Sequence, residues 1–423
     1  MSFFDVEGLS RKTISIFFII KILFGLAVWW VYTFYYTTRS FNDIFNLFDD
    51  AATMYSVIHH HPMHYFQMVS GINSDAPYLK PYYNQMSNWN QPSAAAMFHN
   101  NRILIQFNAF VYLFSFGYYN VHTVFMCFIS LIGLTSIYKT FIPLMKNKIK
   151  ELAFAVFLIP SVLFWGSGIL KEGIILFGLG MLIYSFYQFL FCKISLTGFF
   201  WIIFSSIVLS QTKIYVFVAI VPSFLSLILL KWTGNKHIFL KFLGVHLLVF
   251  ILAVNMYRVN AKWDMLDALQ YKQWIFTVIA KRWHAGSLIE TNTLPFHPNI
   301  ISLIKNAPEA IVNTLFRPHL FESKTFFMLL SALENMFLII LIFTSFLFFK
   351  KPDKESLPLL YTSVFFVLTL ALSIGFVSPV LGAIVRFRVP LLPFFAIIFI
   401  LLSDKEKMIK RMPFLQRILK SDK

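Results

Sequence analysis

The sequence has little charge for its length. Of its 423 residues only 13% are Asp, Glu, Lys or Arg, whereas a soluble domain carries about 25%. Hydrophobic residues make up 58% of the chain, aromatic residues make up 19%, and the mean hydropathy is +0.69. Apolar runs of about twenty residues, the length of a helix that crosses a bilayer, recur along it. The composition excludes a soluble globular enzyme and predicts an all-α, polytopic transmembrane bundle.

Cysteine and acidic residues are also scarce. Cys127 and Cys192 are the only cysteines, and both fall in or beside apolar runs, so no disulfide framework or cysteine metal cluster is expected. Asp and Glu number 19 against 36 Lys and Arg, which gives a net charge of +17. Nucleic-acid binding would use such a charge. Basic residues also accumulate in the short cytoplasmic loops of membrane proteins, and we prefer that explanation and expect no nucleic-acid partner.

The apolar runs predict about ten spans in a single integral membrane domain, residues 1–423. The first run lacks a small-residue cleavage site after it, so we expect it to be retained as a helix. With the N-terminus inside, every alternate short connection is basic, which predicts cytoplasmic termini. We expect the protein in a bacterial inner membrane. The predicted spans are 14–35, 120–143, 151–166, 172–191, 197–210, 214–230, 238–257, 326–349, 357–377 and 389–402.

Two long segments, 36–119 and 258–325, then lie outside the cytoplasm, and residues 403–423 form a basic cytoplasmic tail. Both outer segments contain stretches that mix apolar residues with Trp or Lys, as in helices that lie along a membrane surface. These stretches are 101–117, 261–287 and 299–318.

The stretch NDIFNLFDDAATMYSVIHHHP, residues 42–62, contains three aspartates in a chain that is poor in acids. On a helix, Asp43 and Asp50 lie opposite an apolar stripe with Asp49 on the flank, so we expect them to face an aqueous cleft. One of them could act as a general base or hold a divalent cation. Alternatively, the acids cap the helix dipole. The nearby histidines could bind a metal, although we favour a solvated turn; they are His59, His60, His61 and His64.

Several basic residues lie at or near membrane depth, where an ionisable group indicates a functional site. Arg386 and Arg388 precede Pro390, a good first-turn residue, so we expect two arginines before the tenth span. Arginine offers bidentate geometry to a phosphate. Lys171 is expected in the first turn of the fourth span, and Lys213 in a tight turn between the fifth and sixth.

Further charges surround the start of the eighth span. Arg317, His319 and Glu322 precede it, and Glu334 lies within it and needs a partner, for which we expect an arginine. Glu172 is expected either to pair with Lys171 or to support the same site. The cations at a membrane face and acids in the water suit a substrate with a phosphate at the lipid interface and a hydroxylated group outside. A polyprenyl-phosphate-linked sugar has that form.

These elements together resemble the polytopic GT-C glycosyltransferase superfamily. Its members carry an acidic catalytic residue in the first outer loop, where this chain has Asp43, Asp49 and Asp50, although FDDAATMY departs from the usual Asp-Glu-Tyr pattern. A Thr-Lys turn between spans is matched by Thr212 and Lys213, and an Arg-Tyr-x-x-Pro-x-x-Pro element is approximated by VRFRVPLLPFF. More closely, IPSVLFWGSGILKEGI, LFRPHLFE and GAIVRFRVPLLPFFA resemble uncharacterised Bacteroidetes inner-membrane proteins linked to polysaccharide synthesis.

The resemblance implies an inverting sugar transfer from a polyprenyl-phosphate donor to a glycan, lipid or protein acceptor. Asp50 or Asp49 would activate the acceptor hydroxyl, with Asp43 as the third candidate. The cations would stabilise the leaving phosphate; these are Arg386, Arg388, Lys171, Lys213 and Arg317. An O-antigen or exopolysaccharide polymerase or ligase remains the alternative, and it would depend more on the arginines. A lipid-linked glycan transporter and a non-enzymatic membrane scaffold remain open too. No cofactor is indicated, apart from a divalent metal that the acids could bind.

Overall fold

The computed structural model describes residues 2–36, 42–89, 101–282, 287–289 and 299–411. Parts of both long outer segments and residues 412–423 of the basic tail therefore lie outside the described residues. Within the described ranges every regular element is helical, and the only β-type pairings are isolated bridges. The all-α class predicted from the sequence is confirmed.

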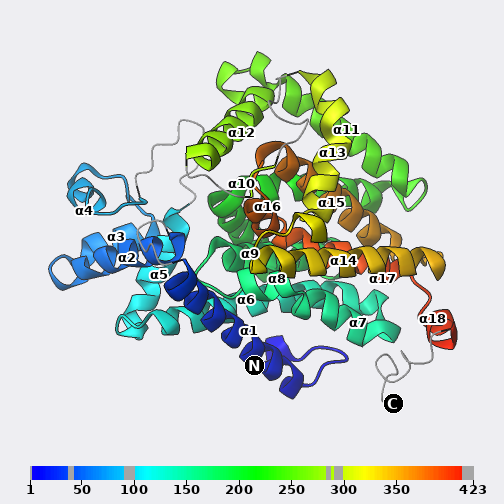
Figure 1. The fold of residues 1–423 in the computed structure, drawn as a ribbon, viewed down its shortest axis with the longest axis horizontal. Coiled ribbons are helices and arrows are strands. Elements are labelled where there is room, and N and C mark those ends of the chain that lie inside the picture. Colours follow the sequence, from blue (N-terminus) through cyan, green and yellow to red (C-terminus); the bar gives the residue numbers. More distant parts are fainter. Residues whose placement is uncertain (1, 37–41, 90–100, 283–286, 290–298, 412–423) are drawn as a thin grey trace. The chain divides into compact units, whose positions relative to one another are not determined.

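Helices make up most of the described chain (Figure 1). Many begin at a polar side chain that accepts from a free backbone N–H of the first turn, as Ser10 Oγ does from Thr13 N at 3.1 Å. The α-helices are α1 (Arg11–Trp30), α2 (Asp43–Ser56), α3 (Pro62–Ser70), α4 (Lys80–Tyr83), α5 (Arg102–Ser115), α6 (Tyr119–Phe141), α7 (Ile149–Ala153), α8 (Pro160–Trp165), α9 (Lys171–Tyr187), α10 (Leu196–Thr233), α11 (Ile238–Asn255), α12 (Met265–Arg282), α13 (Ile300–Phe316), α14 (Phe326–Leu347), α15 (Leu357–Val377), α16 (Leu381–Phe387), α17 (Leu392–Leu402) and α18 (Lys405–Arg411).

Among the described residues, 8 helical segments are long and apolar enough to cross a membrane. The chain is therefore an integral membrane protein with several spans. The segments are Arg11–Tyr35, Tyr119–Leu144, Lys171–Cys192, Leu196–Thr233, Ile238–Arg258, Phe326–Leu347, Leu357–Val377 and Leu381–Leu402.

Four of the ten predicted spans differ from these segments. The tenth, 389–402, begins earlier, at Leu381. The third, 151–166, is broken: Pro160 has no N–H to donate, and Ile159 before it is extended (φ −62°, ψ 125°). The fifth and sixth both fall in α10, where Lys213 has non-helical angles (φ −148°, ψ 92°). The predicted break at Lys213 is therefore present. At ~1.5 Å per residue the 38 residues of α10 would measure about 57 Å if straight, far more than one bilayer crossing needs.

The chain divides into two compact units. Unit 1 comprises Met1–Ile137, Val162–Ser185 and Ser195–Phe217, and unit 2 comprises Tyr138–Ser161, Phe186–Ile194 and Val218–Lys423.

In unit 1, α2 and α5 pack side by side (Figure 1). Their apolar faces join a buried cluster that includes Phe48, Trp89 and Tyr112. The backbones of α6 and α9 are in contact where Gly133 meets Gly180. This close approach requires glycine, because a Cβ on Gly180 would clash with the Gly133 carbonyl oxygen. Small residues at such a crossing allow transmembrane helices to approach closely.

In unit 2, α13 packs along α15, and α17 packs against both α14 and α15. Gly375 of α15 lies against the backbone of Ala310 in α13. At the same crossing, Thr314 Oγ1 donates to the Ala371 carbonyl oxygen at 2.9 Å. These contacts fix the position of the C-terminal end of α13, to which predicted site residues are bound.

Candidate functional site

The three aspartates of α2 have different surroundings. Asp43 and Asp49 are exposed, but Asp50 is buried, with only 4% of its surface exposed. Its Oδ1 accepts from Ser87 N and its Oδ2 accepts from Asn88 N, each at 2.8 Å. The expectation that Asp50 faces an aqueous cleft is therefore wrong, because a segment 37 residues further along the chain returns to cover it.

Opposing effects act on the Asp50 carboxyl group. Burial raises its pKa above the usual value, while the backbone N–H groups of Ser87 and Asn88 favour the carboxylate and limit the rise; the Asp49 charge adds a further small increase. A carboxylate with both oxygens held by backbone donors is well suited to anchor a loop. Asp43 and Asp49 retain access to solvent and are better placed to meet a substrate.

Among the described residues, the histidines after α2 are not grouped with other potential metal ligands. His59, His60 and His61 are exposed, and His64 Nδ1 lies 3.2 Å from the Tyr82 hydroxyl. Within the described part of the chain, no group of three or more His, Cys, Asp or Glu side chains is arranged to hold a metal ion.

A buried ion pair joins α9 to the break in α10, within unit 1. Lys213 Nζ lies 2.9 Å from Glu172 Oε1, and the side chains are 8% and 0% exposed. The sequence suggested Lys171 as the partner of Glu172, whereas the structure pairs Glu172 with Lys213. Lys171, one residue earlier, is partly exposed at the start of α9. A cation at a helix N-terminus favours the binding of an anion there.

The acidic helix α2 and the start of α9 share apolar packing. Ile44 and Phe45 of α2 belong to the same buried cluster as Leu170, which directly precedes Lys171. Asp43 directly precedes Ile44. Unit 1 thus places an exposed aspartate and a partly exposed lysine each one residue from the same buried cluster, although 128 positions (171 − 43) separate them in the sequence.

Arg388 of unit 2 is fully buried and binds the end of α13. Its Nη1 donates to the carbonyl oxygens of Thr314, Leu315 and Arg317 at 3.2, 3.4 and 3.1 Å. The last carbonyls of a helix have no partner within the helix, and a cation there also stabilises the negative end of its dipole. We expected Arg388 just before the tenth span, but the structure places it inside the segment Leu381–Leu402.

The second nitrogen of Arg388 reaches α14. Its Nη2 donates to Asn335 Oδ1 at 2.6 Å and lies 3.4 Å from Glu334 Oε1. Ser161 satisfies the rest of Glu334, donating through its backbone N at 2.6 Å and its hydroxyl at 2.8 Å. The predicted pairing of Glu334 with an arginine is confirmed. With both terminal nitrogens of its guanidinium occupied in this way, Arg388 has a structural role.

Arg317 lies at the edge of this network and is less buried. Its guanidinium pairs with Glu322 and donates through Nη1 to Asn313 Oδ1 at 3.2 Å, and its side chain is 19% exposed. Burial acts to raise the pKa of Glu322, but Arg317 and the backbone N–H of His319 outweigh it, so the pKa is lowered. His319 itself is exposed.

Arg386, the remaining predicted cation, lies in the last turn of α16 and is partly buried. Unit 1 therefore holds the aspartates with Lys171, Glu172 and Lys213, and unit 2 holds the three arginines with Glu322 and Glu334. Ser161 and the Ser87–Asn88 backbone are not predicted from the sequence. Ser161 follows Pro160, whose helix break was a visible signal, whereas backbone donors from a distant loop carry no signal in the sequence.

Comparisons with known proteins add no assignment: no family model, curated protein or solved structure matches this chain.

Proposed function

We propose that the protein is a membrane glycosyltransferase that moves a sugar from a polyprenyl-phosphate donor to a glycan, lipid or protein acceptor. The observation that carries this proposal is the packing of Ile44 and Leu170 in one buried cluster. Through this cluster the N-terminus of α2, with its exposed aspartate, and the N-terminus of α9, with its lysine, adjoin the same buried core. A base for an acceptor hydroxyl and a cation for a leaving phosphate are the two groups such a transfer needs.

Asp43 is the preferred general base, because it is exposed and adjoins the shared cluster. Asp49, also exposed, is the other candidate. Lys171 would stabilise the phosphate that leaves the sugar. The buried pair of Glu172 and Lys213 would hold the start of α9 against the break in α10 and so position Lys171.

The distribution of basic residues supports an orientation for this site. Lysines and arginines fill the tail and every alternate short loop, which favours a cytoplasmic location for both termini. The residues after the first span would then face away from the cytoplasm, in a bacterial inner membrane. Donor and acceptor would meet on that outer face.

Deletion followed by complementation tests the function. A host that lacks the gene is expected to accumulate lipid-linked precursor without the transferred sugar, measured by mass spectrometry of extracted lipids. Asp43→Asn and Lys171→Gln should fail to restore transfer, since loss of a general base costs about 100-fold or more. Asp267→Asn is the matched control, because Asp267 is also an exposed acid in the first turn of a helix, α12. Full transfer by both site variants would refute the proposal.

A polysaccharide polymerase or ligase is the second candidate. Arg317 supports it, because Glu322 and Asn313 fix a guanidinium that remains 19% exposed and could bind a pyrophosphate. In that case Arg317→Gln should abolish product formation while Asp43→Asn has little effect. Unpolymerised repeat units, and not an undecorated precursor, would accumulate in the deletion strain.

A further inference from the structure

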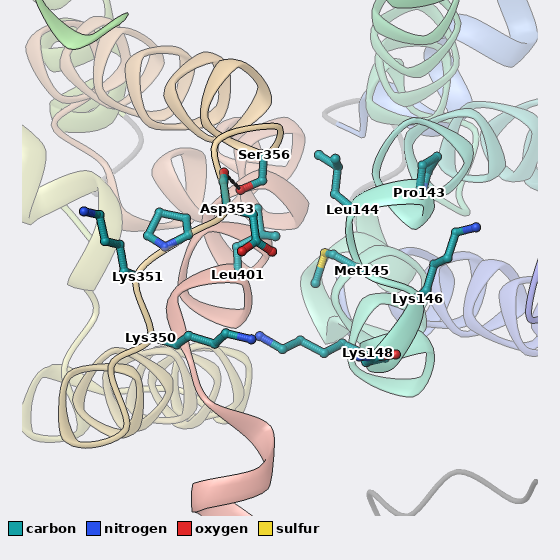
Figure 2. Close-up of a pocket in the computed structure, with 12 residues that line it drawn as sticks. Pro143, Leu144, Met145, Lys146, Lys148, Lys350, Lys351, Asp353, Ser356 and Leu401 are labelled. Carbon is teal, nitrogen blue, oxygen red and sulfur yellow. Dashed lines mark hydrogen bonds between the residues drawn. The ribbon is translucent and has the colours of Figure 1, made fainter. Parts of the chain in front are cut away.

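Unit 2 contains a pocket of about 350 Å³ where several of its helices end (Figure 2). This volume is at the lower end of the range for sites that bind small molecules or headgroups, about 300–1,000 Å³. The pocket is lined by Pro143, Leu144, Met145, Lys146, Asn147, Lys148, Lys350, Lys351, Pro352, Asp353, Ser356 and Leu401.

The pocket lies at one boundary of the membrane-spanning region. The segments Tyr119–Leu144, Phe326–Leu347 and Leu381–Leu402 end beside it, and Leu357–Val377 begins beside it. Residues at the ends of four spans are at the depth of lipid headgroups and not in the hydrocarbon.

Positive charge dominates the lining. The lining contains four lysines and one acid, Asp353, so it carries a net charge of +3. Figure 2 shows the side chains of Lys148 and Lys350 pointing toward each other with their ammonium groups adjacent. Burial, followed by the charge of Lys350, lowers the pKa of Lys148 to about 8.

The fold holds these two lysines together despite their repulsion. Lys148 Nζ donates to the carbonyl oxygens of Ile400 and Ser403, both at 2.6 Å, at the end of α17. The backbone N of Lys350 donates to the Leu402 carbonyl oxygen at 2.8 Å. Both lysines are thus tied to the same helix end, and an anion between them would relieve the repulsion.

Two acids outside the lining, Glu151 and Asp404, act on Lys148 and offset part of the repulsion, but each also has a cation partner of its own. Glu151 on α7 pairs with Lys405, with Nζ and Oε1 2.9 Å apart. Asp404 receives the backbone N–H of Lys407 at 3.1 Å and lies 3.6 Å from its ammonium group. Asp353 is the single acid in the lining itself.

We propose that this pocket binds the phosphate of an anionic phospholipid headgroup, such as that of phosphatidylglycerol. A basic pocket between transmembrane helices at headgroup depth has the charge and the position for this ligand. The positive-inside pattern favours the cytoplasmic leaflet for it. The site is independent of the proposed sugar transfer, because it uses none of the residues assigned to that reaction.

Native mass spectrometry of the full chain, released from nanodiscs that contain phosphatidylglycerol and phosphatidylcholine in equal amounts, tests the site. The pocket variant is Lys350→Gln/Lys351→Gln, and both residues are exposed, so the fold should persist. The control is Lys231→Gln/Lys236→Gln, which removes the same charge from another exposed helix end. Circular dichroism would verify that all forms are folded.

We expect the wild type and the control to retain phosphatidylglycerol in preference to phosphatidylcholine. The pocket variant should bind it about 25-fold more weakly, since each lysine near an anionic headgroup contributes about fivefold, or ~1 kcal/mol. Equal retention by the pocket variant and the wild type would overturn the proposal. So would binding of inorganic phosphate at this pocket without any preference for phosphatidylglycerol, because the ligand would then be a soluble anion.

Discussion

Replacing Arg388 by methionine should destabilise unit 2 strongly. Methionine fills a similar volume but provides no donor, so Glu334 would remain as a buried carboxylate with only Ser161 to bind it. Removing one partner of a buried ion pair costs about 3–5 kcal/mol. The three carbonyl groups that Arg388 now satisfies would add to this cost. We therefore expect the free energy of unfolding to fall by about 5 kcal/mol, the upper end of this range.

A double-mutant cycle separates the charge from the packing. Glu334→Gln removes the carboxylate charge but keeps an amide oxygen that can accept from Ser161. The double variant Arg388→Met/Glu334→Gln should therefore lose less stability than the two single variants together. The expected coupling free energy is about 2 kcal/mol.

Tryptophan fluorescence during SDS titration of the protein in mixed micelles would measure these losses. Arg258→Met is the matched control, because Arg258 is exposed and its replacement should change stability by less than about 0.5 kcal/mol. A loss below about 1 kcal/mol for Arg388→Met, or strict additivity of the two substitutions, would contradict the capping role assigned to Arg388.

Three more outcomes follow from the contacts. Asp50→Asn should lower stability by about 2 kcal/mol, because an amide cannot accept from both backbone N–H groups, and hydrogen exchange of residues 87–89 should then accelerate. Gly180→Ala should separate α6 from α9 at Gly133 and lower the thermal midpoint, whereas Gly244→Ala, with open space around it, should not. The lowered pKa of Glu322 contributes stability that is present above its unfolded pKa, near 4.5, and is lost as the pH falls through the folded value. Thermal midpoints measured from pH 6 to pH 3 should therefore fall less steeply in Glu322→Gln than in the wild type.

Local features of the sequence predicted much of the fold. Apolar runs predicted the helices, and the Thr212–Lys213 dipeptide between two of them predicted the break that Lys213 makes in α10. The charge of Glu334 in an apolar run predicted an arginine partner, since an unpaired carboxylate at that depth is costly. Hydrophobic periodicity is a property of one helix, and the free-energy cost of burying a charge is a property of one residue. Both can therefore be predicted from the sequence.

Contacts between distant segments could not be predicted in the same way. Asp50 was assigned to water from its helical face, yet residues 87 and 88 cover it. Arg388 was placed before a helix because Pro390 favours a first turn, but the helical segment begins at Leu381 and the arginine caps α13. In both cases the partner is a backbone group. Every residue has such a group, so the sequence does not indicate which residue will bind a given side chain.

Two buried cations of the described residues, Lys21 and Arg388, share a function that the bilayer explains. Lys21 Nζ donates to the Gly166 carbonyl oxygen at 3.0 Å, at the break after α8, and Arg388 does the same for the end of α13. Water cannot satisfy such carbonyl groups inside a membrane, so a broken helix there needs a donor from the protein. A charged residue at membrane depth is then as readily explained by a broken helix as by a substrate. Lys171, at the start of α9, and Arg386, in the last turn of α16, are less buried than Lys21 and Arg388, so a phosphate could reach them more readily.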